Sequence, residues 1–289
     1  MDPSGNGSWV AASTAAGDPA IAQVVLNCAP ALSNDQSSLY IAVSSGGFST
    51  GYLVRLDSTT LNTLGEVLLR DPSTGTGASL PDVGTASPTV GPDGDVYFGV
   101  LDLVDGAFTN NDRGWLLHFS GDLTQTKTPG AFGWDDTASI VPASMVPSYT
   151  GSSTYLVMTK YNNYKEDGGD GVNKIAVLDP NATMTDPITQ ATVMQEVLKI
   201  AGVTPDPVLP YVREWCINTA AVDPATDSIL ANSEDGTLYR WNLATNTFTE
   251  SMPLTSPTGE AYTPTVIGVD GTVYAINDST LFAVGLAQN

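Results

Sequence analysis

The sequence has little positive charge, one histidine and two cysteines. Only 10 Lys and Arg residues stand against 31 Asp and Glu, which gives a formal net charge of −21. Nucleic acid or an anionic membrane surface would be repelled by this charge, so neither is expected as a partner. His118 is the only histidine, which excludes a metal site built from several histidines. No apolar run reaches the roughly 20 residues needed to cross a bilayer.

The two cysteines, Cys28 and Cys216, leave two interpretations open. They form one disulfide if the protein is exported, or they are buried small hydrophobic side chains. The start of the chain, Met1 to Trp9, has neither the basic region nor the apolar region of a secretion leader. Scarce lysine and segments rich in Ser, Thr and Gly are typical of exported bacterial proteins. We therefore expect a secreted or periplasmic protein whose leader is not part of this chain.

Charged residues make up only 14% of the chain, whereas Gly (28) and Pro (19) are abundant. This composition favours short strands joined by tight turns over helices. Internal repeats in the sequence support an architecture of short strands and turns. The run from Ala86 to Val90 (ASPTV) is followed by the turn GPDG and the strand DVYFGV, and the run from Tyr262 to Val266 (YTPTV) by GVDG and TVYAIN. A strand, an Asp-Gly turn and a second strand predict a hairpin in each copy.

Copies of this unit begin near residues 28, 86, 138, 218 and 262. The copy near 138 is the most diverged, and its first strand is expected at about Pro142 to Val146. Four-stranded sheets repeated at such spacing predict one all-β domain over residues 1–289, a β-propeller with five blades, or six as the alternative count. The last copy lacks a fourth strand, so we expect residues 20–26 to complete it and close the ring.

The pattern SPTV…DGDVY, together with LYRWN and LVRLDSTT, resembles the repeat of quinoprotein-like β-propellers of the pyrroloquinoline-quinone type. The resemblance covers most of the chain and implies the architecture. The quinoprotein dehydrogenases are larger rings with adjacent cysteines at the cofactor, whereas Cys28 and Cys216 are far apart in this sequence. We therefore expect neither bound quinone nor dehydrogenase activity.

Two local features invite a chemical interpretation. His118 stands where the other copies have Arg55, Val177, Arg240 and Ala283, so a structural role is favoured over a catalytic one. The segment from Glu166 to Gly171 (EDGGDG) is an acidic hairpin tip or a loop that wraps a calcium ion, although it does not match the helix-flanked calcium loop.

In a propeller, the residues just before each first strand meet at one mouth of the central channel. These approaches are rich in polar and aromatic side chains, which we expect to converge there. Asp135, Glu214 and Glu260 are the predicted catalytic carboxylates, and together with Asn27 and Asn218 they are the predicted ligands of an axial Ca²⁺ ion. Trp134, Arg213, Trp215 and Tyr262 are the predicted substrate-binding side chains.

This placement is similar to the axial metal of calcium-dependent propeller hydrolases such as gluconolactonases and phosphotriesterases. It favours a monomeric hydrolase of small esters, lactones or phosphoesters. The alternative for the carboxylates is pairing with Arg213 or capping of turns.

Two other functions stay open. One is a non-catalytic propeller that binds a glycan, peptide or protein through insertions at 101–113, 161–173 and 200–213. Its stacking surfaces would be Tyr161, Tyr164, Trp134 and Trp215. The other is a polysaccharide lyase with a base near Lys160 and Tyr161.

Overall fold

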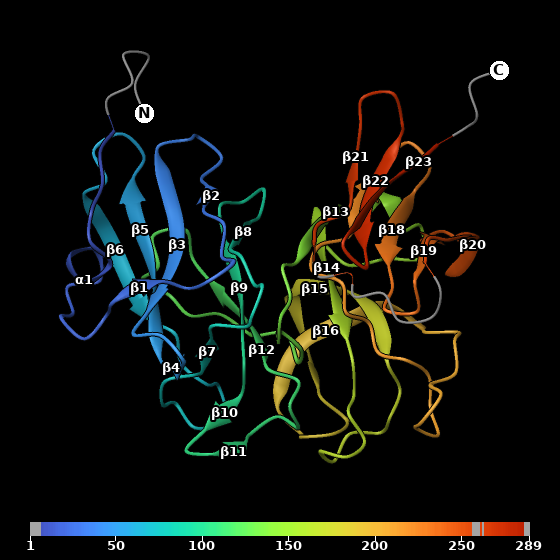
Figure 1. Ribbon diagram of the computed structural model, residues 1–289, viewed down its shortest axis with the longest axis horizontal. Coiled ribbons are helices and arrows are strands. Elements are labelled where there is room, and N and C mark those ends of the chain that lie inside the picture. Colours follow the sequence, from blue (N-terminus) through green and yellow to red (C-terminus); the bar gives the residue numbers. More distant parts are fainter. Residues whose placement is uncertain (1–6, 256–260, 262, 286–289) are drawn as a thin grey trace.

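The computed structural model describes residues 7–255, 261 and 263–285. Among these residues, five antiparallel sheets of three to five strands follow each other in chain order, each at the position of a predicted copy (Figure 1). The first three sheets contain β1 Gln23–Val24, β2 Ala31–Leu32, β3 Ser38–Ser44, β5 Gly51–Asp57 and β6 Thr63–Leu68; then β8 Thr89–Val90, β9 Val96–Val100 and β12 Trp115–Phe119; then β13 Ser139–Pro142, β14 Tyr155–Tyr161, β15 Lys174–Thr185 and β16 Thr192–Ala201.

The remaining elements complete the chain in the same manner. Two small hairpin-like sheets lie at the lower end of the molecule in Figure 1, and the helices are single turns. The elements are β17 Ala221–Asp223, β18 Ser228–Asn232, β19 Thr237–Asn242 and β20 Thr247–Pro253 in the fourth sheet; β21 Val266–Ile267, β22 Val273–Asn277 and β23 Thr280–Val284 in the fifth; β4 Phe48–Ser49 with β7 Leu80–Pro81; β10 Leu103–Val104 with β11 Ala107–Phe108; α1 Ala12–Ala15; and the 3₁₀ turn η1 Ala143–Met145.

The expected closing strand belongs to the first sheet and not to the last. Gln23 and Val24 pair with Ser44 and Val43 of β3, while β2 occupies the other half of the same edge. The seven-residue β3 is longer than β2, so its inner edge offers a free half that β1 fills. The prediction that residues 20–26 complete the last sheet is therefore wrong.

The first strand of the third sheet lies slightly earlier than expected. Strand β13 ends at Pro142, which pairs with Tyr155, and the next three residues form the η1 turn. The observed strand therefore begins a few residues before the strand expected from Pro142 to Val146. Trp134 and Asp135 therefore lie just before the start of β13.

The hydrophobic core lies between neighbouring sheets. One cluster, with Leu53, Phe98 and Trp115, fills the space between the first three sheets, and a second, with Ile175 and Trp241, joins the third and fourth. A smaller cluster packs the fifth sheet on the fourth. Each sheet therefore buries apolar side chains against its neighbours, and this burial stabilises a propeller.

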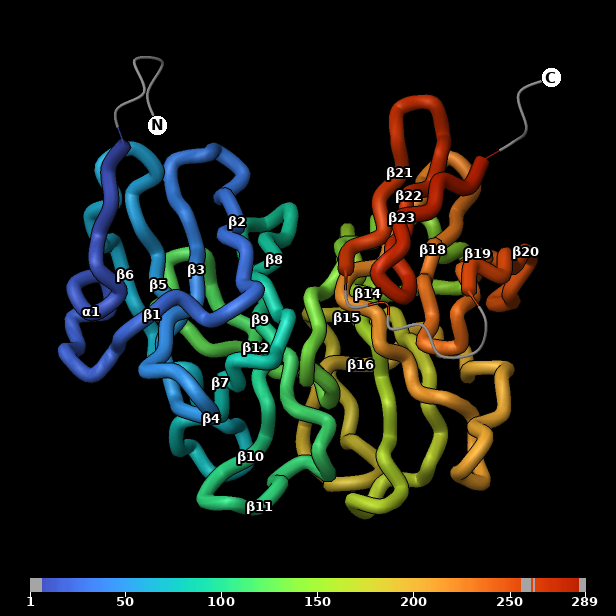
Figure 2. The backbone as a smooth tube through the Cα atoms, viewed as in Figure 1, coloured from blue at the N-terminus to red at the C-terminus, as the bar shows by residue number. Residues whose placement is uncertain are grey.

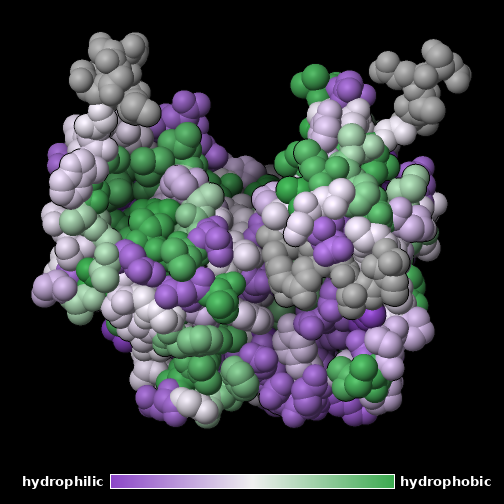
Figure 3. Space-filling model, in the orientation of Figure 1, coloured by the Kyte–Doolittle hydropathy of each residue, from purple (hydrophilic) through white to green (hydrophobic). Residues whose placement is uncertain are grey.

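The two end sheets differ in how their outer faces are covered. The segment around α1 covers the first sheet, where Ala15 and Ile21 pack against Val43 and Val54. Among the described residues, no strand pairing or hydrogen bond joins the last sheet to the first. The backbone trace shows the first and last sheets apart from each other (Figure 2), and the space-filling view shows the molecule hollowed between them (Figure 3).

Hydrogen bonds link the approaches to successive first strands. The backbone N–H groups of Ala29, Ser87 and Thr137 each donate to the approach of the next sheet, and that of Thr265 donates back to the approach of the fourth sheet, at 2.9 to 3.0 Å. The acceptors are Ser87 Oγ, Thr137 Oγ1, the Asn218 carbonyl and the Thr219 carbonyl. This belt fixes the approaches relative to each other, which positions the candidate site. No helix in the described part of the chain has the length and apolar character to cross a membrane.

Candidate functional site

A cavity of about 280 Å³ opens among loops of the second, third and fourth sheets, and we call it the mouth cavity. Its walls come from the loop before β12, the approach to β13, the end of β14 with the loop after it, and the approach to β17. It is lined by Asp112, Trp134, Asp135, Lys160, Tyr164, Glu166, Asp167, Glu214 and Cys216. Five of these nine residues are carboxylic acids, and a single ammonium group, that of Lys160, opposes them.

Asp135 is buried and held rigidly on one side of the mouth cavity. Its Oδ1 atom accepts hydrogen bonds from the Thr85 backbone N–H at 2.5 Å and from Thr85 Oγ1 at 2.6 Å. Its Oδ2 atom lies 3.8 Å from the Lys160 ammonium. The backbone φ of 54° at Asp135 is in the left-handed region, a strained conformation that the surrounding bonds must maintain. One carboxylate oxygen is therefore fully engaged, and the other faces the cation.

The two asparagines predicted as metal ligands form hydrogen bonds within the protein. The Asn218 amide donates to the Thr85 carbonyl at 2.7 Å and to Thr85 Oγ1 at 2.9 Å, and its Oδ1 accepts from Thr219. The Asn27 amide points to the Gly84 carbonyl at 3.5 Å. Both side chains bind the approach to the second sheet, where Thr85 also holds Asp135, and neither lines the mouth cavity.

Glu214 belongs to a cluster of potential metal ligands on the opposite wall. One ligand atom from each of Glu214, Cys216 and Glu234 lies within 4.8 Å of the other two. Cys216 Sγ is 3.5 Å from Glu234 Oε2. Carboxylate oxygens suit Ca²⁺, while a thiol added to them suits Zn²⁺ or another softer ion. Burial and the neighbouring Glu214 raise the pKa of the Tyr164 phenol, which keeps this wall a hydrogen-bond donor.

Asp112 lines the cavity, although it was not predicted from the sequence. Burial, followed by the charges of Asp102, Asp167 and Glu214, raises its pKa to about 7. The backbone of Asp112 is also left-handed, with φ of 60°. A carboxyl group that titrates near neutrality because of crowded negative charge is suited to accept a proton or to bind a cation.

Arg113 fixes the loop that carries Asp112. Its guanidinium group is fully buried and forms a two-point ion pair with Asp186, with N–O distances of 2.7 and 3.2 Å. The same group donates to the Asn110 carbonyl and to Asn110 Oδ1. The Arg113 carbonyl accepts from the backbone N–H groups of Gly133 and Trp134. One residue thus anchors two walls of the mouth cavity.

The acidic segment from Glu166 to Gly171 joins the mouth cavity in part. Glu166 and Asp167 line it, and the Tyr211 hydroxyl donates a short hydrogen bond to Glu166. Asp170 instead accepts the backbone N–H of Val172 at 2.9 Å and stabilises the turn. This segment therefore contributes its first two carboxylates to the same site that the approaches form.

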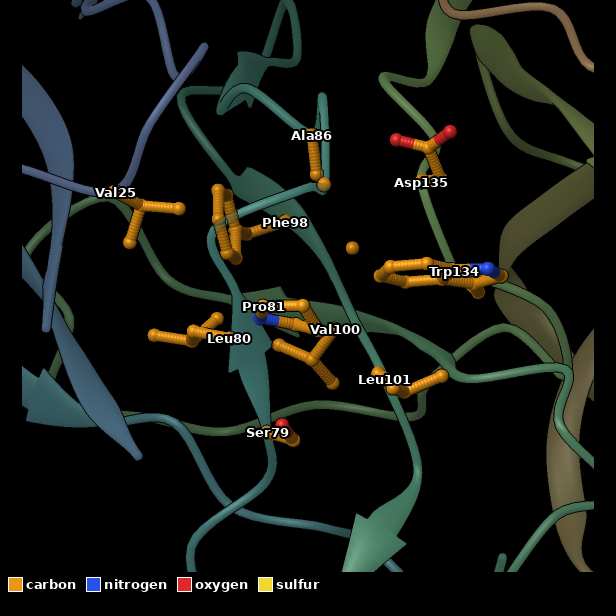
Figure 4. A pocket seen from close by; sticks show the side chains of 12 residues that line it. Val25, Ser79, Leu80, Pro81, Ala86, Phe98, Val100, Leu101, Trp134 and Asp135 are labelled. Carbon is orange, nitrogen blue, oxygen red and sulfur yellow. The ribbon is translucent and has the colours of Figure 1, made fainter. Parts of the chain in front are cut away.

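The predicted substrate-binding aromatics take different positions. Trp134 is half-buried and lines the mouth cavity. Figure 4 shows its indole extending toward Val100 and Phe98, while the Asp135 carboxylate points away, around a narrow space of only about 10 Å³. Trp215 is 1% exposed in the core, packed on Tyr239 and Phe248, and so offers no surface to a ligand.

Other predicted residues lie outside the cavity. Arg213 is buried and does not line it. Tyr161, an alternative stacking or basic residue, is buried beside Phe132 and the Lys174 ammonium. Glu260 and Tyr262 lie outside the described residues. No disulfide joins Cys28 to Cys216; burial raises the pKa of the Cys28 thiol to about 11.

His118 lies in the second sheet, buried and away from the mouth. Its ring stacks on Tyr97 with a centroid distance of 4.5 Å, and Nε2 is 2.8 Å from Asp95 Oδ2. Burial lowers the pKa of the imidazole. This environment agrees with the structural role expected from the repeat alignment.

No known protein family matches the chain, and no curated protein matches it either. Among solved structures, it is similar to the quinohemoprotein alcohol dehydrogenase from Comamonas testosteroni, with a TM-score of 0.52 and 10% sequence identity. The similarity covers 86% of this chain and 49% of that one, so this chain spans about half the length of the dehydrogenase. The comparison supports a quinoprotein-like β-propeller fold.

Proposed function

We propose that this chain is an exported, monomeric, single-domain propeller of five blades that hydrolyses small esters, lactones or phosphoesters with the help of a divalent cation. The site is the mouth cavity. The proposal depends mainly on one observation: Asp112, Asp135, Glu166, Asp167 and Glu214 line one cavity of about 280 Å³, whose lining contains one basic residue, Lys160. Like charges held this close repel each other, and a bound cation relieves that repulsion.

The cluster of Glu214, Cys216 and Glu234 would hold the cation. Ca²⁺ fits the carboxylates, and the thiol makes Zn²⁺ the competitor, so both ions require testing. A cation bound there would polarise the carbonyl or phosphoryl oxygen of a substrate.

Two carboxylates would share the remaining work. Asp112, whose pKa is about 7, would accept the proton of an attacking water molecule. Asp135 and Lys160, held 3.8 Å apart, would orient the substrate by a hydrogen bond and a positive charge. The half-buried ring of Trp134 would form an apolar wall for the acyl or alkyl part.

Cation binding is tested by thermal unfolding with added CaCl₂, ZnCl₂ or a chelator, for the natural chain and for Glu214→Gln. A tightly bound cation at a hundred times its Kd stabilises by about 2.7 kcal/mol, a shift of several degrees. The exposed Glu250, on the surface of the fourth sheet, supplies the matched control Glu250→Gln. Identical melting curves in every condition would remove the cation from the proposal.

Hydrolysis is tested with fluorogenic esters, lactones and phosphotriesters, using Asp112→Asn and Asp135→Asn, with Asp105→Asn at an exposed turn as the control. Rates should fall at least a hundredfold in the first two variants. Cation binding without any hydrolysis would favour the non-catalytic alternative. Turnover of an acidic polysaccharide, lost in Lys160→Met, would favour a lyase.

A further inference from the structure

A second and larger cavity, of about 520 Å³, lies between the first and second sheets, and we call it the side cavity. It is independent of the mouth cavity, with no residue in common. Its volume falls in the range of small-molecule sites. It is lined by Glu66, Val67, Leu68, Arg70, Asp71, Pro72, Gly75, Leu117, Phe119, Thr126, Lys127 and Pro129.

The side cavity exists because the second sheet has no regular outer strand. Residues 126–130 run beside β12 and form two isolated bridges with it, Phe119 with Thr126 and Leu116 with Gly130, but no continuous strand. Sheets that radiate from an axis diverge toward the outside, so a missing outer strand leaves unfilled space there. The outer strand β6 of the first sheet then forms the facing wall.

The deep part of the side cavity is apolar and belongs to the main core. Leu117 and Phe119 are buried, and Val67 and Leu68 on β6 are half-buried opposite them. Because Phe119 packs in the same cluster as the large side chains of the second sheet, this wall is well defined without a ligand. An alkyl chain would find a preformed surface.

The rim of the side cavity carries two of the ten cations of this acidic chain, Arg70 and Lys127. Lys127 is already ion-paired with the buried Asp95. Arg70 is exposed and donates from Nη1 to the Gly75 carbonyl at 2.9 Å, and no carboxylate among the described residues lies within ion-pair distance of it. Most of its guanidinium donors therefore remain available to an anion.

The two acids at the side cavity oppose an anion only weakly. Asp71 is fully buried, and its carboxylate accepts hydrogen bonds from Ser73, Thr74 and Trp115, so its oxygens already have donors. Glu66 is exposed on β6 and screened by water. The net charge of −21 still disfavours a polyanion.

We propose that the side cavity binds an amphipathic monocarboxylate of the medium-chain fatty acid type. Its alkyl chain would lie against Leu117, Phe119 and Val67, and its carboxylate would accept two hydrogen bonds from Arg70. A planar guanidinium matches a carboxylate in this two-point geometry, and a singly charged ligand is the least repelled by the acidic surface.

The test is isothermal titration of the full chain with octanoate, decanoate and the neutral decanol. Affinity should rise about fourfold per added methylene, which corresponds to the transfer free energy of one CH₂ group. Decanoate should bind at least tenfold more tightly than decanol because of the charge-assisted pair with Arg70.

Two variants locate the site. Arg70→Ala should abolish the preference for the acid over the alcohol, whereas the control Lys199→Ala, at an exposed lysine of the third sheet, should keep it. Val67→Phe should fill the cavity and remove binding of both ligands while the circular dichroism spectrum and melting temperature are retained. Three results would overturn the proposal: the absence of saturable binding, equal affinity for decanoate and decanol, or binding that both variants leave intact. Cation binding at the mouth should not change in any of these variants.

Discussion

The ion pair between Arg113 and Asp186 gives the sharpest prediction about how the mouth is held together. Both side chains are almost fully buried, with exposures of 0% and 1%, and two N–O contacts join them. Removing one partner of a buried pair leaves the other charge uncompensated, which typically destabilises a protein by about 3–5 kcal/mol. Thr189 donates two further hydrogen bonds to Asp186 at 2.8 Å, so the lower part of that range is expected here.

The change is Arg113→Met, which keeps most of the aliphatic volume and removes the charge. Urea unfolding followed by tryptophan fluorescence should show a loss of about 3 kcal/mol in the free energy of unfolding, with an unchanged slope. The double variant Arg113→Met with Asp186→Leu should recover at least about 1 kcal/mol relative to additivity, because it no longer buries a lone carboxylate.

Binding at the mouth should report the same change independently. The Arg113 guanidinium also donates to the Asn110 carbonyl and to Asn110 Oδ1, so its loss should release the loop that carries Asp112. Cation affinity should fall in both the single and the double variant. A single variant within about 1 kcal/mol of the natural chain, or strictly additive effects, would refute the reasoning.

Three further outcomes are expected. Burial raises the pKa of both Asp112 and Asp136 to about 7, so the folded chain retains protons that the unfolded chain releases near pH 4. The free energy of unfolding should therefore fall as pH rises from about 4 to 7. Without cation, Tm should be higher at pH 5 than at pH 8, and Asp112→Asn should flatten this dependence on pH. Trp215→Ala should lower the free energy of unfolding in urea by about 3–5 kcal/mol, since the ring lies in the core. The hydrolysis rate per folded molecule should stay within a factor of two. A large loss of turnover with intact stability would indicate instead that Trp215 belongs to the site. Gly99→Ala should lower Tm markedly, because a Cβ there would lie 2.1 Å from the Gly133 carbonyl oxygen. Gly106→Ala lies in open space at a turn with φ of 82°, so it should cost only the backbone strain of that turn. Equal shifts of Tm in both variants would contradict the packing argument.

The sheets could be predicted from the sequence because each copy repeats the same strand and turn chemistry. The partner of residues 20–26 could not, because the edges of the first and last sheets both accept an extended apolar segment. Both β3 and β22 are longer than the strands β2 and β21 beside them, so the repeat pattern does not reveal which edge residues 20–26 pair with.

The same limit applies to the candidate site. Along the approach to β17, successive side chains alternate, so Glu214 and Cys216 line the mouth while Trp215 between them enters the core. A run of polar and aromatic residues does not reveal which alternate set faces inward. Asp112 lies in an insertion whose fold depends on the buried Arg113, and repeat alignment carries no information about insertions.

The unequal ends of the sheet stack have a consequence for how the protein opens. Each sheet contacts mainly its neighbours, so the molecule resembles a linear array in which unfolding begins at the less protected end. The α1 segment covers the first sheet, whereas Val266, Tyr274 and Leu281 of the last sheet are exposed. Amide exchange should therefore be fastest in β21–β23 and slowest in the third sheet. The mouth cavity, formed by the second to fourth sheets, would persist while the last sheet frays.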